Sequence, residues 1–244
     1  MKAMIFAAGL GTRLRPITDN IPKALVPVGG MTLLEHVVTK LAEQGFDQQI
    51  INVHHHADKI IEFLKEKRNF GLRIEISDER EMLLDTGGGI KKASHFFDDG
   101  EPFLVHNVDI LSDANLSELY RIHKESDMDA TLLVKERETS RYLYFGEDKH
   151  LKGWMNLNTG EIKSPYADFK PEDYSKYAFS GIHIISPRLF DLMEGYPQKF
   201  PIMDFYVGNA AKASIGYSLN NELKMIDVGK LDSLKEAEEH FRNF

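Results

Sequence analysis

Hydrophobic and polar positions follow two alternating spacings along the first half of the chain. Apolar runs with the length of β-strands lie at residues 2–6, 48–53, 72–77, 102–109 and 129–135. Segments whose apolar residues recur every three or four positions, as on one face of a helix, lie between them at residues 32–45, 58–67 and 115–126. Strands that alternate with helices predict βαβ units. We therefore expect an α/β fold with a Rossmann-like, mainly parallel mixed sheet flanked by helices.

The helix expected at residues 32–45 carries signals for its own start and end. Thr32 is placed to cap the first turn, and Glu35 follows at the spacing of a capping box. Gly45 is the residue type that most often ends a helix. The stripe predicted to face the core consists of Leu33, Leu34, Val37, Val38 and Leu41.

The pattern changes after residue 140, where short strands and turn residues replace the helices. Turns predicted at residues 146–148 and 158–160 indicate β-hairpins. Residues 177–186 predict a further strand, and residues 231–241 predict an amphipathic helix. Because neither a repeat nor a linker interrupts the chain, we expect a single domain over residues 1–244.

Composition and charge narrow the possible function classes. The 244 residues carry a formal net charge of −8, which argues against nonspecific binding to nucleic acid or to a membrane surface. The absence of cysteine excludes disulfides and thiolate metal sites. The apolar residues 3–8 are too few for a secretory signal, and no apolar run is long enough to span a membrane. We therefore expect a cytoplasmic protein.

Glycine and positive charge gather directly behind the first predicted strand, in the segment FAAGLGTRLRPITDNIPKALVPVGG at residues 6–30. In an α/β fold this loop lies at the carboxyl edge of the sheet, where ligands bind. Gly9 and Gly11 let backbone N–H groups approach phosphate oxygens closely. Arg13 and Lys23 add positive charge, so the segment predicts a site for a phosphorylated ligand.

This loop fits neither of two widespread phosphate-binding motifs. The dinucleotide fingerprint requires a third glycine where Leu14 stands, and the P-loop pattern G-x-x-x-x-G-K-[ST] does not occur. The string AAGLGTRLRPIT…PKALVPV instead resembles the signature of the sugar-phosphate nucleotidyltransferases. Later motifs match in the same order: LLDTGGGI at 83–90, HNVDIL at 106–111, FSGIHIIS at 179–186 and MIDVGKLDSLKEAE at 225–238.

The resemblance covers essentially the whole chain. It points most closely to the short N-acetylmuramate 1-phosphate uridylyltransferases and the mannose- or heptose-1-phosphate guanylyltransferases. We expect the chain, like these short forms, to lack an added C-terminal β-helix domain. Residues 1–135 would form the nucleotide-binding part, and residues 136–244 the sugar-binding β-hairpin region and the C-terminal part.

The resemblance implies an enzyme that joins two anions. Family members couple a sugar 1-phosphate to a nucleoside triphosphate and release pyrophosphate, so positive charge is needed where the phosphates meet. By resemblance, Arg13 contacts the triphosphate, and Lys23 lies between the α-phosphate and the sugar phosphate. Asp109 completes the catalytic residues.

The same resemblance assigns the binding residues. Those expected at the nucleotide are Ala7, Ala8, Gly9, Gly11, Thr12, Arg13, Thr86, Gly87 and Gly88. Those expected at the sugar are Asn107, Ser180 and Gly181. The DTGGG segment at residues 85–89 is expected to form a loop at the sheet edge, close to the base and ribose.

A Mg²⁺ cofactor is expected between Asp109, at the end of the strand 102–109, and Asp227. Carboxylates supply the hard oxygen ligands that Mg²⁺ prefers, with the remaining positions left to phosphate and water. Three nearby residues depart from the family pattern. Val108 replaces a small residue, Met225 a common Trp and Lys230 a common Thr, and Val108 is expected to shift the carboxylate slightly.

Several alternatives remain open at the level of sequence. UTP is favoured, with a bulky amino sugar, because LLDTGGGI resembles the uridylyltransferase subgroup more than the long guanylyltransferases. A GTP-dependent guanylyltransferase acting on mannose or heptose 1-phosphate is the alternative. A glycosyltransferase would typically carry a D-x-D pair, and a noncatalytic nucleotide sensor would not need Lys23, Asp109 and Asp227 together. The protein is expected to be a monomer or a homodimer.

Two further features have plainer interpretations. His54, His55 and His56 are consecutive, so in a strand they point to alternate sides and do not converge on one metal ion. Trp154, the only tryptophan, is interpreted as a core residue of the hairpin region rather than as a pocket wall.

Overall fold

The computed structural model describes residues 1–242, which separate into two compact units. The first unit contains Met1–Leu83, Val105–Leu116 and the residues from Lys224 onward, and the second contains Leu84–Leu104 and Ser117–Leu223. The chain thus enters each unit more than once, whereas the sequence pattern divides it near residue 135. A division by packing does not decide whether the units fold independently, so the single domain stays a prediction.

The first unit is built on a parallel sheet. Strands β1 (Lys2–Phe6), β4 (Gln48–Val53) and β5 (Arg73–Asp78) pair in parallel, and β6 (Phe103–Asn107) neighbours β1 on its other side. The side chains of β1 and β4 are almost all buried, as expected for strands covered on both faces. The parallel pairing of β1, β4 and β5 confirms the predicted parallel part of the fold.

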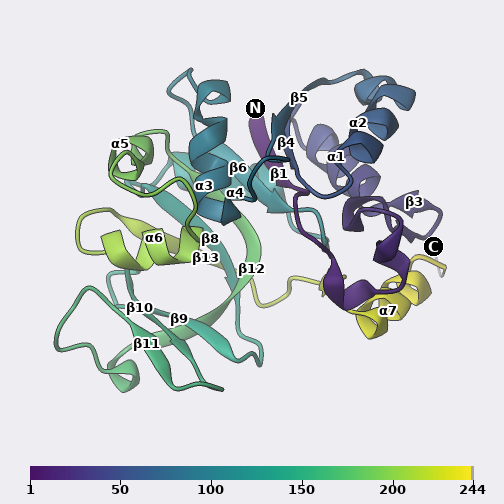
Figure 1. The fold of residues 1–244 in the computed structure, drawn as a ribbon. Coiled ribbons are helices and arrows are strands. Elements are labelled where there is room, and N and C mark those ends of the chain that lie inside the picture. Colours follow the sequence, from purple (N-terminus) through teal and green to yellow (C-terminus); the bar gives the residue numbers. More distant parts are fainter. Residues whose placement is uncertain (243–244) are drawn as a thin grey trace. The chain divides into compact units, whose positions relative to one another are not determined.

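Helices α1 (Leu33–Glu43), α2 (Ala57–Glu66) and α7 (Leu231–Arg242) belong to the first unit. The Thr32 hydroxyl caps α1 by accepting the Glu35 N–H at 3.1 Å, as predicted, whereas the Glu35 carboxylate pairs with Lys67. The five predicted stripe residues of α1 are all buried, and Gly45 lies just beyond its end with φ +86°. Figure 1 shows α7 in yellow beside the purple segment that follows β1.

Two short ladders complete the first unit, and the sequence pattern did not predict them. Strand β2 (Pro27–Val28) pairs with β3 (Met31–Thr32), and β7 (Ile110–Ser112) pairs antiparallel with β14 (Met225–Asp227). Two or three residues are too few for a periodicity to be visible, because pairing of such strands depends on tertiary contacts.

The second unit is mainly antiparallel. Its strands are β8 (Ala130–Lys135), β9 (Arg141–Phe145), β10 (Leu151–Asn156), β11 (Glu161–Lys163), β12 (Ser175–Ile185) and β13 (Ile215–Leu219). Strand β13 differs in that it pairs in parallel with β8. Both predicted hairpin turns are present: the Gly146 N–H donates to the His150 carbonyl at 3.0 Å, and the Gly160 N–H donates to the Asn156 carbonyl at 2.8 Å.

The second unit also contains most of α4 (Leu116–Lys124), together with α3 (Asp85–Lys92), α5 (Leu189–Met193) and α6 (Ile202–Asn209). Parallel strands, antiparallel strands and flanking helices together confirm the predicted mixed α/β fold class. Within residues 1–242, no helix combines the length and the apolar character needed to cross a bilayer.

Candidate active site

The glycine loop begins where β1 ends and turns sharply at Gly11. Gly11 has φ +63°, and a Cβ atom there would lie 3.0 Å from the Thr18 methyl group and 3.1 Å from the Lys23 Cβ. The Thr18 hydroxyl also donates to the Gly11 carbonyl at 2.8 Å. Both the backbone conformation and the crowding therefore favour glycine at this position.

A buried hydrogen-bond network fixes the start of this loop, and sequence reasoning missed it. The Asn52 side-chain oxygen accepts the N–H groups of Ala7, at 2.8 Å, and Ala8, at 3.2 Å. The Asn52 amide in turn donates to the Glu79 carboxylate at 2.8 Å. The available signal was a polar residue between the apolar Ile51 and Val53 near the end of the strand. Any nucleotide contact by Ala7 and Ala8 has to come from groups other than these two N–H groups.

Lys23 and Asp109, assigned separately from sequence motifs, form an ion pair. Lys23 begins the short 3₁₀ helix η3 (Lys23–Leu25) and is only 8% exposed. Asp109 was expected to end a strand over 102–109, but β6 stops at Asn107 and Asp109 lies in the turn before β7. Val108, which departs from the family pattern, is buried, and its N–H donates to the Phe6 carbonyl. The pair therefore lies directly beyond the ends of β1 and β6.

Asp227 reaches the same region through the ladder between β7 and β14. Asp227 pairs in register with Ile110, and the Val228 N–H donates to the Asp109 carbonyl at 2.8 Å. The ladder thus brings the backbones of the two predicted metal ligands side by side. Their carboxylates supply the hard oxygens that suit Mg²⁺. Among the described residues, no cluster of three or more His, Asp or Glu side chains could hold a metal.

Arg13 shares a cavity with Asp227. This cavity has a volume of 270 Å³ and is also lined by Met225, Lys230 and Glu236. A Cβ atom on Gly229 would lie 2.7 Å from a terminal nitrogen of Arg13 and 2.7 Å from an Asp227 oxygen. The guanidinium and the carboxylate therefore converge over Gly229, and a larger residue there would push their ends aside. Thr12, also assigned to the nucleotide, begins the same short 3₁₀ helix as Arg13, η1 (Thr12–Leu14).

The DTGGG segment corrects the sequence prediction of a loop, because it forms helix α3. Gly87 and Gly88 are buried, and their N–H groups donate to the Phe200 carbonyl at 2.8 and 3.2 Å. The Thr86 hydroxyl accepts the Ile202 N–H at 2.9 Å. Close packing against the 198–202 segment explains why glycines are needed here. The contact of Thr86, Gly87 and Gly88 with nucleotide stays a prediction.

Replacing Gly87 by alanine is expected to lower the free energy of unfolding by about 1 to 3 kcal/mol. The new Cβ would lie 2.3 Å from the Phe200 ring and 2.9 Å from the Phe200 carbonyl oxygen, so the backbone has to shift. Urea denaturation measures the change. Gly195→Ala is the matched control, because its Cβ would meet no atom within 4 Å. Equal stability of the two variants would contradict the packing explanation.

The residues assigned to the sugar lie in different units. Asn107 ends β6 in the first unit. The preceding residue, His106, is fully buried, and this burial lowers the pKa of His106 to about 4 and keeps its ring neutral. Ser180 and Gly181 lie on β12 in the second unit. The Ser180 hydroxyl oxygen is buried without a hydrogen-bond partner among residues 1–242, and Gly181 has φ +75°. Their shared role at a sugar stays a prediction.

Two further residues named in the sequence analysis, His54 and Trp154, lie in different units. The His54 ring nitrogen Nδ1 lies 2.7 Å from the Glu79 carbonyl oxygen, beside the Asn52 network. Trp154 is not a hairpin core residue as interpreted from sequence. It is half-buried and lines a cavity of 230 Å³ in the second unit.

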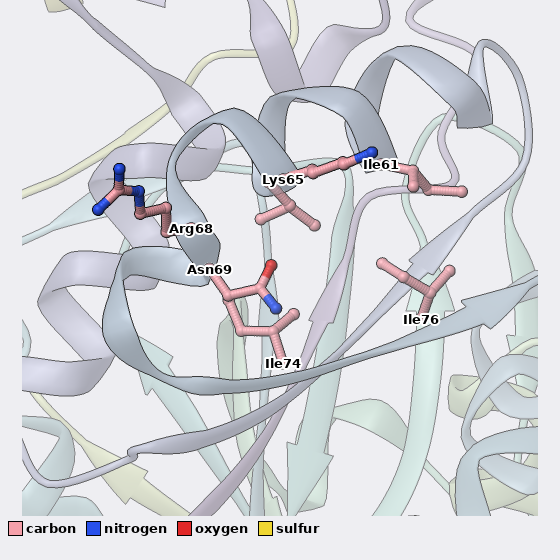
Figure 2. A pocket seen from close by; sticks show the side chains of 7 residues that line it. Ile61, Lys65, Arg68, Asn69, Ile74 and Ile76 are labelled. Atoms are coloured by element: carbon pink, nitrogen blue, oxygen red, sulfur yellow. The ribbon is translucent and has the colours of Figure 1, made fainter.

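A further cavity of 460 Å³ lies between α2 and β5 in the first unit. Ile61 on α2 faces Ile76 on β5, next to Ile74, while Arg68 extends away from the cavity (Figure 2). None of its lining residues belongs to the predicted site, and their side chains are mostly aliphatic. This cavity is therefore separate from the glycine loop and the carboxylates.

The chain is similar in sequence to a known protein family and to several of its members. A family model described as nucleotidyl transferase matches residues 2–243. The UTP–glucose-1-phosphate uridylyltransferase of Synechocystis sp. is 30% identical over 97% of the chain and 62% of its own length. The mannose-1-phosphate guanyltransferase of Yarrowia lipolytica is 31% identical over 94% and 61%. The chain thus spans about three fifths of the length of these two relatives.

A third relative matches more strongly over a shorter stretch. The N-acetylmuramate alpha-1-phosphate uridylyltransferase of Caulobacter vibrioides is 46% identical over 44% of the chain and 45% of its own length. Among solved structures, HddC from Yersinia pseudotuberculosis complexed with GMP-PN has a TM-score of 0.75, with 24% identity over 98% of this chain and 99% of that one. UDP-glucose pyrophosphorylase from Acinetobacter baumanii has a TM-score of 0.78, with 18% identity over 98% and 92%. At these identities the two structures show the same fold and no more.

Proposed function

The chain belongs to the nucleotidyl transferase family, and we propose that it transfers a nucleotidyl group from a nucleoside triphosphate to a sugar 1-phosphate. An oxygen of the sugar phosphate attacks the α-phosphorus, the bond to the β-phosphate oxygen breaks, and pyrophosphate leaves. The products are a nucleotide sugar and pyrophosphate.

The observation that carries this proposal is the ion pair between the buried Lys23 and the partly exposed Asp109 beside the glycine loop. The protein is acidic overall, with a net charge of −8, yet it holds a cation where two anionic substrates would meet. Lys23 would neutralise charge that builds up on the α-phosphate during attack, and Arg13 would hold the triphosphate. A largely buried, preorganised cation is more effective than an exposed one, because water screens the exposed charge.

Asp109 and Asp227 would hold Mg²⁺, which supplies charge neutralisation and orients phosphate oxygens when bound. The ladder that aligns their backbones supports this assignment. Asp109 also pairs with Lys23, so the carboxylate would have to orient the lysine and ligate the metal with different oxygens. The lysine thereby takes a defined position close to the phosphates.

UTP is the proposed nucleotide, with GTP as the second candidate. Two of the relatives described above are named uridylyltransferases and one a guanyltransferase, so the comparisons support both bases. A pocket that fits a pyrimidine excludes guanine sterically. A pocket that fits guanine admits uracil but leaves buried polar groups unpaired, at about 1 to 3 kcal/mol each.

The test is pyrophosphate release from each of the four nucleoside triphosphates, crossed with a panel of sugar 1-phosphates. We expect UTP with an amino-sugar 1-phosphate to give the highest kcat/KM. A preference for GTP with mannose 1-phosphate would replace the uridylyltransferase by a guanylyltransferase. Absence of pyrophosphate release from every pair would overturn the proposed activity itself.

A further inference from the structure

The buried network behind the glycine loop divides the backbone donors of the loop into two groups. The N–H groups of Ala7 and Ala8 are taken up by the Asn52 side-chain oxygen, at 2.8 and 3.2 Å. Among the described residues, the N–H groups of residues 9–12, which follow directly, donate to no protein acceptor. Gly9 is exposed, and a Cβ atom there would meet no atom within 4 Å. This second group of donors is therefore open to an anion.

Asn52 can serve the loop in only one of its two amide orientations. Its oxygen accepts hydrogen bonds and its NH₂ group donates them, so a flipped amide would set donors against the Ala7 and Ala8 N–H groups. The Asn52 nitrogen donates to the Glu79 carboxylate at 2.8 Å. A carboxylate accepts hydrogen bonds and offers none, so Glu79 holds the amide in the orientation that the loop requires.

Glu79 is itself fixed by the backbone around it, within the same unit. Its side chain is buried, and its N–H donates to the Val53 carbonyl at 2.8 Å. The Glu79 carbonyl accepts the Met82 N–H at 3.1 Å and lies 2.7 Å from the His54 Nδ1. Glu79 is therefore tied to the end of β4, directly beside Asn52, and gives the amide a fixed partner.

We propose that Asn52 and Glu79 are positioning residues for the nucleotide. Glu79 orients the Asn52 amide, and Asn52 holds the start of the glycine loop so that the N–H groups of residues 9–12 face the triphosphate. The inference rests on the proposed function and deepens it, because it assigns the shape of the nucleotide site to two residues that lie behind the loop. The protein uses the first two donors of the loop, and the phosphate oxygens use the donors that follow.

The first experiment exchanges the two polar groups. Asn52→Asp keeps an acceptor for the loop but sets two carboxylates against each other, and Glu79→Gln no longer fixes the amide, because Gln both accepts and donates. Asn52→Asp should weaken binding of the triphosphate by about ten- to a hundredfold, and Glu79→Gln should weaken it less. The double variant again sets one amide donor against one carboxylate, with the same total charge, and should recover most of the lost affinity.

The matched control removes buried hydrogen bonds from the same strand without touching the loop. The Gln49 side chain lies on β4, is fully buried and donates to the Val38 and Phe46 carbonyls at 3.1 and 2.9 Å. Gln49→Met should lower thermal stability and leave the affinity for the triphosphate unchanged. A loss of affinity in this control equal to that in Asn52→Asp would reduce the role of Asn52 to stability and overturn the inference.

Direct titration with UTP and with GTP gives the Kd of each variant, and steady-state kinetics give the KM of both substrates. In the single variants we expect Kd and KM for the triphosphate to rise, while KM for the sugar 1-phosphate changes little. Glu79→Gln keeps the shape of the side chain, so it tests the orientation of the amide even if Asn52→Asp fails to fold. Unchanged affinity in the single variants, or a double variant no better than Asn52→Asp, would overturn the inference.

The two measurements separate the two possible failures. Turnover of the wild-type protein with unchanged nucleotide affinity in the variants overturns the positioning role and leaves nucleotidyl transfer in place. Absence of wild-type turnover with every substrate pair overturns the proposed function, and the titrations then decide the positioning role, because they need no turnover. A wild-type protein that bound no nucleoside triphosphate would overturn both.

Discussion

Lys23→Ala is expected to lower kcat by about 10²- to 10³-fold while nucleotide binding stays nearly unchanged. The lysine is buried and held by Asp109, so its charge is fixed in advance at the place where negative charge develops. A contact made mainly in the transition state lowers kcat and kcat/KM together when it is lost. Steady-state kinetics with a direct titration of the nucleotide separate this loss from a loss of affinity.

Two further variants control this result. Arg13→Ala is expected to weaken nucleotide binding as well, because Arg13 lines the Asp227 cavity and is assigned to the triphosphate. Lys23→Arg keeps the charge and should retain more activity than Lys23→Ala, provided that thermal unfolding shows both to be folded. If Lys23→Ala mainly weakened nucleotide binding and Arg13→Ala mainly lowered kcat, the two roles would have to be exchanged.

Asp109→Asn is expected to lower turnover by about 10³-fold, through the loss of both a metal ligand and the partner of Lys23. The side chain keeps its size, so folding should change little. Comparison with Asp227→Asn separates the two roles, because the structure shows no pairing between Asp227 and Lys23. Asp227→Asn should lose activity that excess Mg²⁺ partly restores, whereas Asp109→Asn should not recover.

Removal of the metal is a second test of the hypothesis that Asp109 and Asp227 bind Mg²⁺. Activity should disappear in EDTA and return when Mg²⁺ is added in excess. Near-normal turnover in EDTA would rule out the assignment of Asp109 and Asp227 as metal ligands, while the role of Lys23 would still stand.

The strongly patterned elements of the fold were predictable from the sequence. Residues 2–6 and 48–53 form β1 and β4 within the expected bounds, because a buried parallel strand needs a continuous apolar run. The α1 stripe and its Thr32 cap were equally clear, since both depend on local spacing. These features depend on residues that are close together in the sequence, so a sequence pattern reveals them.

Features that depend on distant contacts were not predictable in this way. Three consecutive glycines argue against a helix, because glycine is a poor helix former. They nevertheless lie in α3, where the Phe200 segment approaches too closely for larger residues. The same limit applies to Asn52 and to the ladder that aligns Asp227 with Ile110.

In the candidate site too, local motifs were predictable and contacts between distant residues were not. Motifs identified Lys23 and Asp109 separately, and the structure adds their ion pair. Trp154 was assigned to a core because a single aromatic residue in a hairpin gives no sign of which side is open. Only packing distinguishes a cavity wall from a core position.

The two strands of the ladder between β7 and β14 are synthesised at different times, because they lie far apart in the chain. The ribosome releases Asp109 well before Asp227, because the chain from Ser117 to Leu223 is made between them. A nascent chain can therefore form the Lys23–Asp109 pair while the second carboxylate is still inside the ribosome. On the proposed mechanism such a chain is inactive, and catalysis begins only when β14 emerges and pairs with β7.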